Sequence, residues 1–110
     1  MAVSRGGVYY AHLPEIGDRP VLVISWDAIS NGMDSPIVCL ITKTDRVRAF
    51  DTHVFVEAHE TGLDFDSYIL CHELVTLDGE DFRRQVGNVS IGTLIRVEAA
   101  LRIALDLPSS

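Results

Sequence analysis

Short apolar segments separated by turn-forming residues run through most of the chain. Each segment is rich in β-branched or aromatic side chains, a composition typical of β-strands. The segments cover residues 8–13, 21–25, 37–42, 53–56 and 68–77, and residues 86–89 form a candidate sixth. The connections between them leave no room for crossover helices, so we expect a largely antiparallel sheet, curled on itself as a small SH3-like β-barrel.

The C-terminal segment has a helical period instead. Arg96 and Arg102 fall away from the face on which the apolar residues recur. Ser90 is a good N-cap, and Pro108 stands where a helix can no longer continue. We therefore predict a C-terminal helix after Ser90 and one short additional helical turn within residues 79–85. The apolar residues expected on one face of the long helix are Ile91, Leu94, Ile95, Leu101 and Leu105.

Length and composition predict one folded domain. With 110 residues, 47% of them hydrophobic and 23% charged, residues 1–110 fit a single α+β domain and not a disordered chain. A domain this small gains from a partner, and the helix is apolar on nearly all sides over residues 99–105. We therefore expect a homodimer, although a deep seat for the helix within one chain would also explain this pattern.

The chain has no feature of an exported or membrane-bound protein. No apolar stretch follows a basic start, and none approaches the length of about 18 residues that a membrane helix needs. We expect a cytoplasmic protein without membrane contact. Cys39 and Cys71 lie inside apolar segments, which favours two buried free thiols over a zinc pair, and nothing requires a disulfide. We expect no metal and no cofactor.

Charge argues against binding to nucleic acid through the overall field. Sixteen acidic and nine basic residues give a net charge of −7. The charges are unevenly distributed, however, because Lys43, Arg46 and Arg48 lie within six residues of one another, while a group of carboxylates follows residue 56. A local basic surface is therefore compatible with the acidic total.

Two residues stand at the ends of buried segments, where a rigid strand can hold a functional side chain. Arg19 lies in a turn directly ahead of residues 21–24, and Thr42 ends the apolar run 37–41. A guanidinium binds phosphate oxygens through two parallel hydrogen bonds, and a hydroxyl can complete such an anion pocket. Taken alone, Arg19 is more commonly a solvated turn residue paired with Asp18, and Thr42 an ordinary strand residue.

The order and spacing of several segments resemble those of the MazF/PemK/Kid family of toxins along nearly the whole chain. The matching segments are RGGVYYAHL at residues 5–13, RPVLVIS at 19–25, LIT at 40–42, THV at 52–54, GLD at 62–64, DSYIL at 66–70, TLD at 76–78 and VEAAL at 97–101. The chain departs from many relatives in one place. Only residues 14–18 separate Leu13 from Arg19, whereas many relatives have a long Gly-rich loop there. We expect this shortening to affect base recognition.

The resemblance implies a homodimeric toxin of a toxin–antitoxin system and a MazE-like antitoxin partner. It further implies a metal-independent, sequence-specific endoribonuclease that cleaves single-stranded RNA, leaving 2′,3′-cyclic phosphate and 5′-hydroxyl ends. Arg19 and Thr42 match the family's catalytic positions. Because an arginine is a poor proton donor near neutral pH, we interpret Arg19 as a phosphate clamp and Thr42 as a donor in the anion pocket.

Further candidates concern RNA contact. His72 and Glu73 match a polar pair that contacts RNA in several relatives, and His72 is a candidate for proton transfer. An exposed pair on the outer face of a strand is an equal alternative. Residues 43–51 offer Lys43, Arg46 and Arg48 for phosphates and Phe50 for stacking on a base. We place Trp26 in the core or in a dimer interface.

Two other functions are compatible with the same fold. One is a non-catalytic toxin of the gyrase-poison type, which binds a protein target and in which Arg19 and Thr42 have no role. The other is a homologue that binds antitoxin but has lost cleavage, an alternative supported by the short loop and the acidic net charge.

Overall fold

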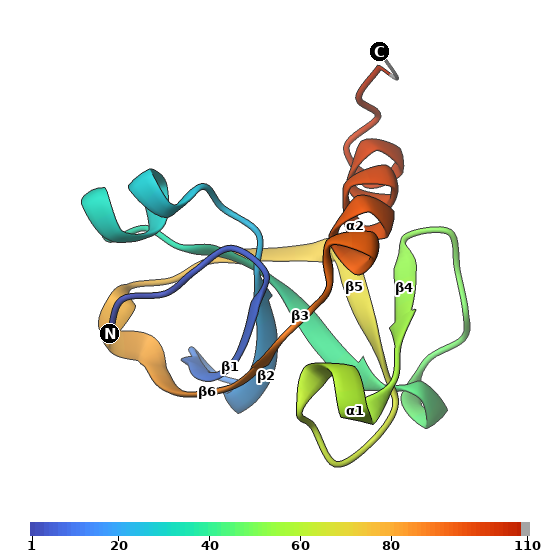
Figure 1. Cartoon of the computed structure of the whole chain (residues 1–110), viewed down its shortest axis with the longest axis horizontal. Coiled ribbons are helices and arrows are strands. Elements are labelled where there is room, and N and C mark those ends of the chain that lie inside the picture. Colours follow the sequence, from blue (N-terminus) through green and yellow to red (C-terminus); the bar gives the residue numbers. More distant parts are fainter. Residues whose placement is uncertain (109–110) are drawn as a thin grey trace.

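A computed structural model describes residues 1–108 as a curled sheet with a helix at its C-terminal end (Figure 1). The strands are β1 (Gly7–Leu13), β2 (Gly17–Val23), β3 (Ile37–Lys43), β4 (His53–Val56), β5 (Ser67–Thr76) and β6 (Phe82–Asn88). The helices are α1 (Ala58–Thr61) and α2 (Ile91–Ala104). Three short helical turns lie between strands: η1 (Ala28–Gly32), η2 (Thr44–Arg46) and η3 (Gly79–Asp81). Within residues 1–108 no helix is long and apolar enough to cross a membrane.

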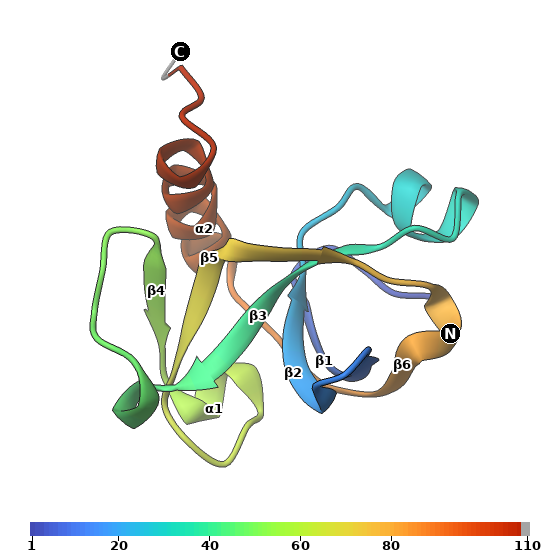
Figure 2. The same ribbon diagram turned by 180° about the vertical axis from the view of Figure 1, so that it is seen from behind.

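The strands form one antiparallel sheet in the order β4-β5-β3-β2-β1-β6, which confirms the predicted curled sheet with a C-terminal helix. Its edge strands, β4 and β6, are not paired with each other among the described residues, so the sheet stays open. The pairing of β3 with β5 shifts register between Cys39 and Leu40, and β5 bends sharply along its length (Figure 2). This bend wraps the sheet around two apolar clusters.

The two cysteines lie in one of these clusters, between the sheet and α2. Cys39 and Cys71 are both buried and both free, as predicted. A side-chain hydrogen bond with Cys71, together with burial, raises the pKa of Cys39 well above its usual value. The Cys39 thiol is therefore protonated and acts as a small apolar core residue.

The predicted strands match the observed ones closely, except at β2 and β6. Both begin four residues earlier than predicted, β2 at Gly17 and β6 at Phe82. The predicted short helical turn within residues 79–85 is η3 (Gly79–Asp81), and residues 82–85 belong to β6. Those residues pair with β1, and the Phe82 ring packs edge-on against Tyr9 with centroids 5.3 Å apart. The sequence pattern did not predict η1, η2 or α1.

Helix α2 begins as predicted but buries a different face. The Ser90 hydroxyl accepts a hydrogen bond from the Thr93 amide at 3.1 Å, which confirms the N-cap. The buried residues are Thr93, Val97 and Ala100, with Leu94 and Leu101 partly buried. Ile91, Ile95 and Leu105 are 79%, 60% and 51% exposed, so the predicted face is wrong at these three positions. The helix packs on β5 and β4, and its C-terminal end projects beyond the sheet in both views (Figures 1 and 2).

A carboxylate joins the two helices. Glu60 of α1 accepts hydrogen bonds from the Ser90 amide at 3.1 Å and from the Thr93 hydroxyl at 2.6 Å. Arg96 donates to the same Thr93 hydroxyl at 3.1 Å and to the Phe55 carbonyl of β4 at 3.0 Å. Glu60 thus fixes the four-residue α1 against the N-terminus of α2, where a negative charge is favourable.

Candidate functional site

A tight turn between β1 and β2 sets the position of Arg19. Glu15 and Gly17 have φ angles of 67° and 96°, and the Ile16 amide donates to the Leu13 carbonyl at 3.2 Å. Glycine adopts such a positive φ without steric cost. Only residues 14–16 lie between the two strands, so the short loop expected from the sequence is a three-residue turn. Arg19 is consequently part of the strand β2.

The side chains of Arg19 and Asp18 point in different directions, although the two residues are adjacent in β2. The Asp18 carboxylate lies 3.1 Å from Nδ1 of His12 and 3.9 Å from Nε of Arg83. The Arg19 guanidinium instead donates to the Ile41 carbonyl of β3 at 3.4 Å. Alternation along a strand sends adjacent side chains to opposite faces, so the pairing of Arg19 with Asp18 does not occur. Arg19 reaches across to the end of β3.

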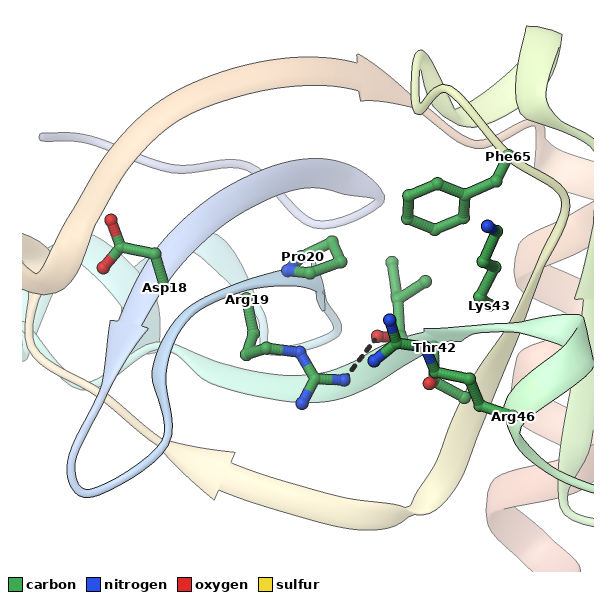
Figure 3. A pocket seen from close by; sticks show the side chains of 8 residues that line it. Asp18, Arg19, Pro20, Thr42, Lys43, Arg46 and Phe65 are labelled. Atoms are coloured by element: carbon green, nitrogen blue, oxygen red, sulfur yellow. Dashed lines mark hydrogen bonds between the residues drawn. The ribbon is translucent and has the colours of Figure 1, made fainter.

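Arg19 and Thr42 line the same cavity, of about 250 Å³ (Figure 3). Thr42 lies near the end of β3, opposite Tyr68 of β5, and only 7% of its surface is exposed. Within residues 1–108 its hydroxyl makes no hydrogen bond with another side chain or the backbone, so it is available to a ligand. The full lining consists of Asp18, Arg19, Pro20, Ile41, Thr42, Lys43, Arg46 and Phe65.

The charge of this cavity is opposite to that of the whole chain. Arg19, Lys43 and Arg46 line it, and none forms an ion pair with a carboxylate of residues 1–108. Asp18 contributes to the wall, but its carboxylate points away from Thr42 (Figure 3). Three free cations beside a free hydroxyl suit an anion with several oxygens, such as a phosphate group. The net charge of −7 therefore does not describe this surface.

Phe65 is a cavity residue that the sequence analysis missed. It lies between α1 and β5, and Nζ of Lys43 is 5.7 Å from the centre of its ring. The only sequence signal is an aromatic residue flanked by Asp64 and Asp66, which marks an exposed loop and says nothing about its neighbours. The fold alone brings Phe65 to Thr42.

His72 and Glu73 are in a different place from Arg19 and Thr42. His72 lines a second cavity, of about 520 Å³, with Phe50, Thr52, His53, Ile103 and Ala104. Its Nδ1 is 3.1 Å from the Thr52 hydroxyl, its Nε2 is 3.6 Å from the Glu73 carboxylate, and its ring stacks on that of His53 with centroids 5.3 Å apart. His72 therefore lies outside the cavity that Arg19 and Thr42 share.

The remaining predicted RNA contacts divide between the two cavities. Lys43 and Arg46 line the first, whereas Phe50, which is 70% exposed, lines the second. Arg48 lies between Arg46 and Phe50 in the chain, is exposed and lines neither cavity. Its carbonyl accepts a hydrogen bond from His53 at 2.8 Å. Trp26 lines neither cavity and is 72% exposed, so its predicted place in the core is wrong.

Comparisons with known proteins agree on one family. The family model described as PemK-like, MazF-like toxin of type II toxin–antitoxin system matches residues 4–105. The chain is 33% identical to endoribonuclease EndoA of Bacillus subtilis (strain 168), with 97% of each protein covered. It is 34% identical to endoribonuclease MazF6 of Mycobacterium tuberculosis (strain H37Rv), covering 97% of this chain and 100% of MazF6.

The fold agrees as well. A solved structure described as an endoribonuclease in complex with its cognate antitoxin, from a mycobacterial species, superposes with a TM-score of 0.86 at 25% identity. The match covers 99% of this chain and 100% of that one. The names of these relatives support the predicted endoribonuclease function and not the non-catalytic alternatives. The chain therefore belongs to the PemK-like, MazF-like toxin family of type II toxin–antitoxin systems.

Proposed function

We propose that this chain is the toxin of a type II toxin–antitoxin system and cleaves single-stranded RNA, without a metal, at the cavity of Arg19 and Thr42. The observation that carries the proposal is the group of three unpaired cations around a free hydroxyl at the ends of β2 and β3. Such a site binds the phosphate between two nucleotides and favours the negative charge that develops during cleavage.

Each side chain has a distinct role in this mechanism. The 2′-hydroxyl of one nucleotide gives up its proton to solvent as its oxygen attacks the neighbouring phosphorus, the bond from phosphorus to the 5′-oxygen breaks, and the leaving 5′-oxygen takes up a proton from solvent. The Arg19 guanidinium holds two phosphoryl oxygens, exchanging its long 3.4 Å contact with Ile41 for stronger charged hydrogen bonds. The Thr42 hydroxyl donates to the same oxygens. Lys43 and Arg46 hold adjacent phosphates.

The second cavity serves nucleotides farther along the strand. Phe50 offers a ring for stacking, while His72 and Glu73 offer polar groups for base edges. In this proposal His72 contacts RNA and does not transfer protons at the scissile phosphate, because it lines a different cavity. Arg48 adds a phosphate contact between the two cavities. Base preference then depends on residues 47–52, since the three-residue turn before β2 carries no long recognition loop.

A second copy of the chain and a MazE-like antitoxin complete the assembly. Ile91 and Ile95 of α2 are 79% and 60% exposed and lie one turn apart, so they form an apolar stripe that a homodimer interface would cover. An extended acidic segment of the antitoxin would occupy the cationic cavity in place of RNA. Two buried free thiols suit a reducing cytoplasm, where RNA and antitoxin are also found.

The direct test is cleavage of a long RNA by the purified protein in EDTA, followed by mapping of the ends. We expect cuts at a short recurring sequence with 2′,3′-cyclic phosphate and 5′-hydroxyl termini. Intact RNA, or cuts that need a divalent metal, would contradict the proposal. Inhibition of gyrase without RNA cleavage would favour the protein-binding alternative.

A further inference from the structure

Phe65 lies where a nucleobase would be if a phosphate occupied the cationic cavity. The ring lines the same cavity as Arg19 and Thr42 and is drawn across it from Arg19 (Figure 3). It is half-buried, packs on its inner side against the core cluster between the sheet and α2, and leaves the rest of its surface to the cavity. It is the only aromatic residue among the lining residues of this cavity within residues 1–108.

The loop that carries Phe65 is held in place from both sides. The Asp66 carbonyl accepts a hydrogen bond from the Thr44 amide at 3.2 Å, and the Asp66 carboxylate accepts one from the Ala58 amide at 2.9 Å. The Ser67 hydroxyl donates to the Phe65 carbonyl at 3.3 Å. These contacts tie the loop to η2 and to α1. The backbone at Phe65 is therefore held before any ligand binds, which lowers the entropic cost of binding.

The chemistry of the cavity is divided between its two sides. Arg19, Lys43 and Arg46 provide charge for phosphates, whereas Phe65 provides a flat apolar surface. Single-stranded RNA presents both groups together, because each phosphate lies within a few ångströms of two bases that are free to stack on an aromatic ring. The Lys43 ammonium, 5.7 Å from the ring centre, adds a cation beside the stacked base.

We propose that Phe65 binds the substrate by stacking on a base flanking the scissile phosphate, and so holds the RNA strand in the cavity. This inference rests on the proposed RNA cleavage and names a residue that the family resemblance does not supply. Stacking is tolerant of base identity, so Phe65 contributes to substrate affinity more than to sequence recognition. The larger ring surface of a purine favours a purine at that position.

The test uses the RNA site mapped above, made uncleavable by a 2′-O-methyl group and carrying 2-aminopurine on either side of the scissile phosphate. Stacking quenches 2-aminopurine fluorescence. We expect quenching at one of the two positions on binding to the wild type and to Phe65→Tyr, and loss of quenching with Phe65→Leu. Phe55→Leu is the matched control, because Phe55 is 42% exposed on β4 and lines neither cavity.

Cleavage kinetics supply the second readout. We expect Phe65→Leu to raise KM about 10-fold with kcat nearly unchanged, and Phe65→Tyr to restore KM, in line with the stacking contribution of one base. If Phe65→Leu has a lower melting temperature than the wild type, Phe65→Met is used as the apolar variant in its place. Binding and cleavage by the wild type without quenching, or an unchanged KM in the apolar variants, would overturn the inference while leaving the proposed function intact. A wild type that neither binds nor cuts RNA would overturn both.

Discussion

Asp18 and Arg19 are neighbours in the chain and both line the cavity, yet their charged groups have different partners. Asp18 faces His12 and Arg83, and Arg19 faces the end of β3. The sequence leaves open whether the two residues pair with each other. The strand conformation of β2 decides this, because it turns adjacent side chains to opposite faces. Arg19 is thereby left with a weak carbonyl contact that a phosphate can replace.

At Thr42 the hydroxyl is expected to matter more than the shape of the side chain. We predict that Thr42→Val, which keeps the shape and removes the hydroxyl, lowers the single-turnover cleavage rate about 100-fold, the usual effect of losing one donor to a developing oxyanion. Thr42→Ser keeps the donor and should retain at least a tenth of the activity. Equal rates for Thr42→Val and the wild type would remove Thr42 from the mechanism.

His72 provides the complementary test. Because it lines the second cavity and contacts Thr52, we predict that His72→Asn leaves the single-turnover rate within about 3-fold of the wild type between pH 6 and 8. General acid–base catalysis typically contributes 100-fold or more. A loss of that size in a variant with an unchanged Tm, or a pH profile that loses one limb, would return proton transfer to His72.

At the scale of elements, the sequence is most informative where one strand repeats a simple pattern. The apolar runs predicted β1, β3, β4 and β5 nearly to the residue, because alternation and β-branched composition are local properties. Helix α1 was missed since four residues cannot form a stable helix alone. It is stabilised instead by tertiary contacts, through the carboxylates of Asp66 and Glu60.

Local sequence patterns likewise do not identify the buried face of α2 or all the residues of the site. Ile91 and Ile95 are as apolar as Val97, so periodicity alone does not say which of them faces β4 and β5. Arg19 and Thr42 were identified through their place in ordered family segments, and the fold puts them in one cavity. Phe65 comes from a third segment, and only the three-dimensional contact reveals it.

Glu60 makes the link between α1 and α2 dependent on pH. Burial raises the pKa of its carboxyl, but hydrogen bonds from Thr93 and Ser90 and the charge of Arg96 outweigh that effect and lower the pKa below its usual value of 4.5. A lowered carboxyl pKa stabilises the fold above pH 4.5, and this stabilisation is lost as the pH falls through the lower, folded-state value.

We therefore predict that Glu60→Gln lowers the free energy of unfolding at pH 7 by about 1.5 kcal/mol, the lower end of the range for hydrogen bonds to a charged group, because Glu60 is only half-buried. The difference from the wild type should shrink as the pH falls below 4.5, as measured by denaturant unfolding at several pH values. Glu80→Gln is the control, because that side chain is exposed in η3. A difference that stays constant down to pH 3 would contradict the assigned role of the Glu60 charge.

At the scale of the whole molecule, an acidic protein carries one cationic cavity. The net charge of −7 opposes non-specific association with RNA, while Arg19, Lys43 and Arg46 attract the phosphates that reach the cavity. This arrangement restricts binding to strands that fit the site. An apolar stripe on α2 and the protruding end of that helix leave a separate surface for a second copy of the chain.

Salt dependence measures this local charge. With four phosphate contacts, from Arg19, Lys43, Arg46 and Arg48, the logarithm of the RNA binding constant should fall with the logarithm of salt concentration at a slope of about −3, since each contact to a single strand contributes about −0.7. Arg46→Ala should reduce the slope by about 0.7, and Arg102→Ala, on the exposed side of α2, should leave it unchanged. Binding that does not respond to salt would contradict a phosphate-binding cavity.

The most direct measurement of the central claim is the single-turnover cleavage rate of Arg19→Ala on a defined RNA in EDTA, compared with the wild type and with Arg19→Lys. We predict a loss of at least about 100-fold for Arg19→Ala and an intermediate rate for Arg19→Lys, which keeps the charge but not the two-pronged geometry, with melting temperatures unchanged. Undiminished cleavage by a folded Arg19→Ala protein would contradict the claim that this cavity is the catalytic site.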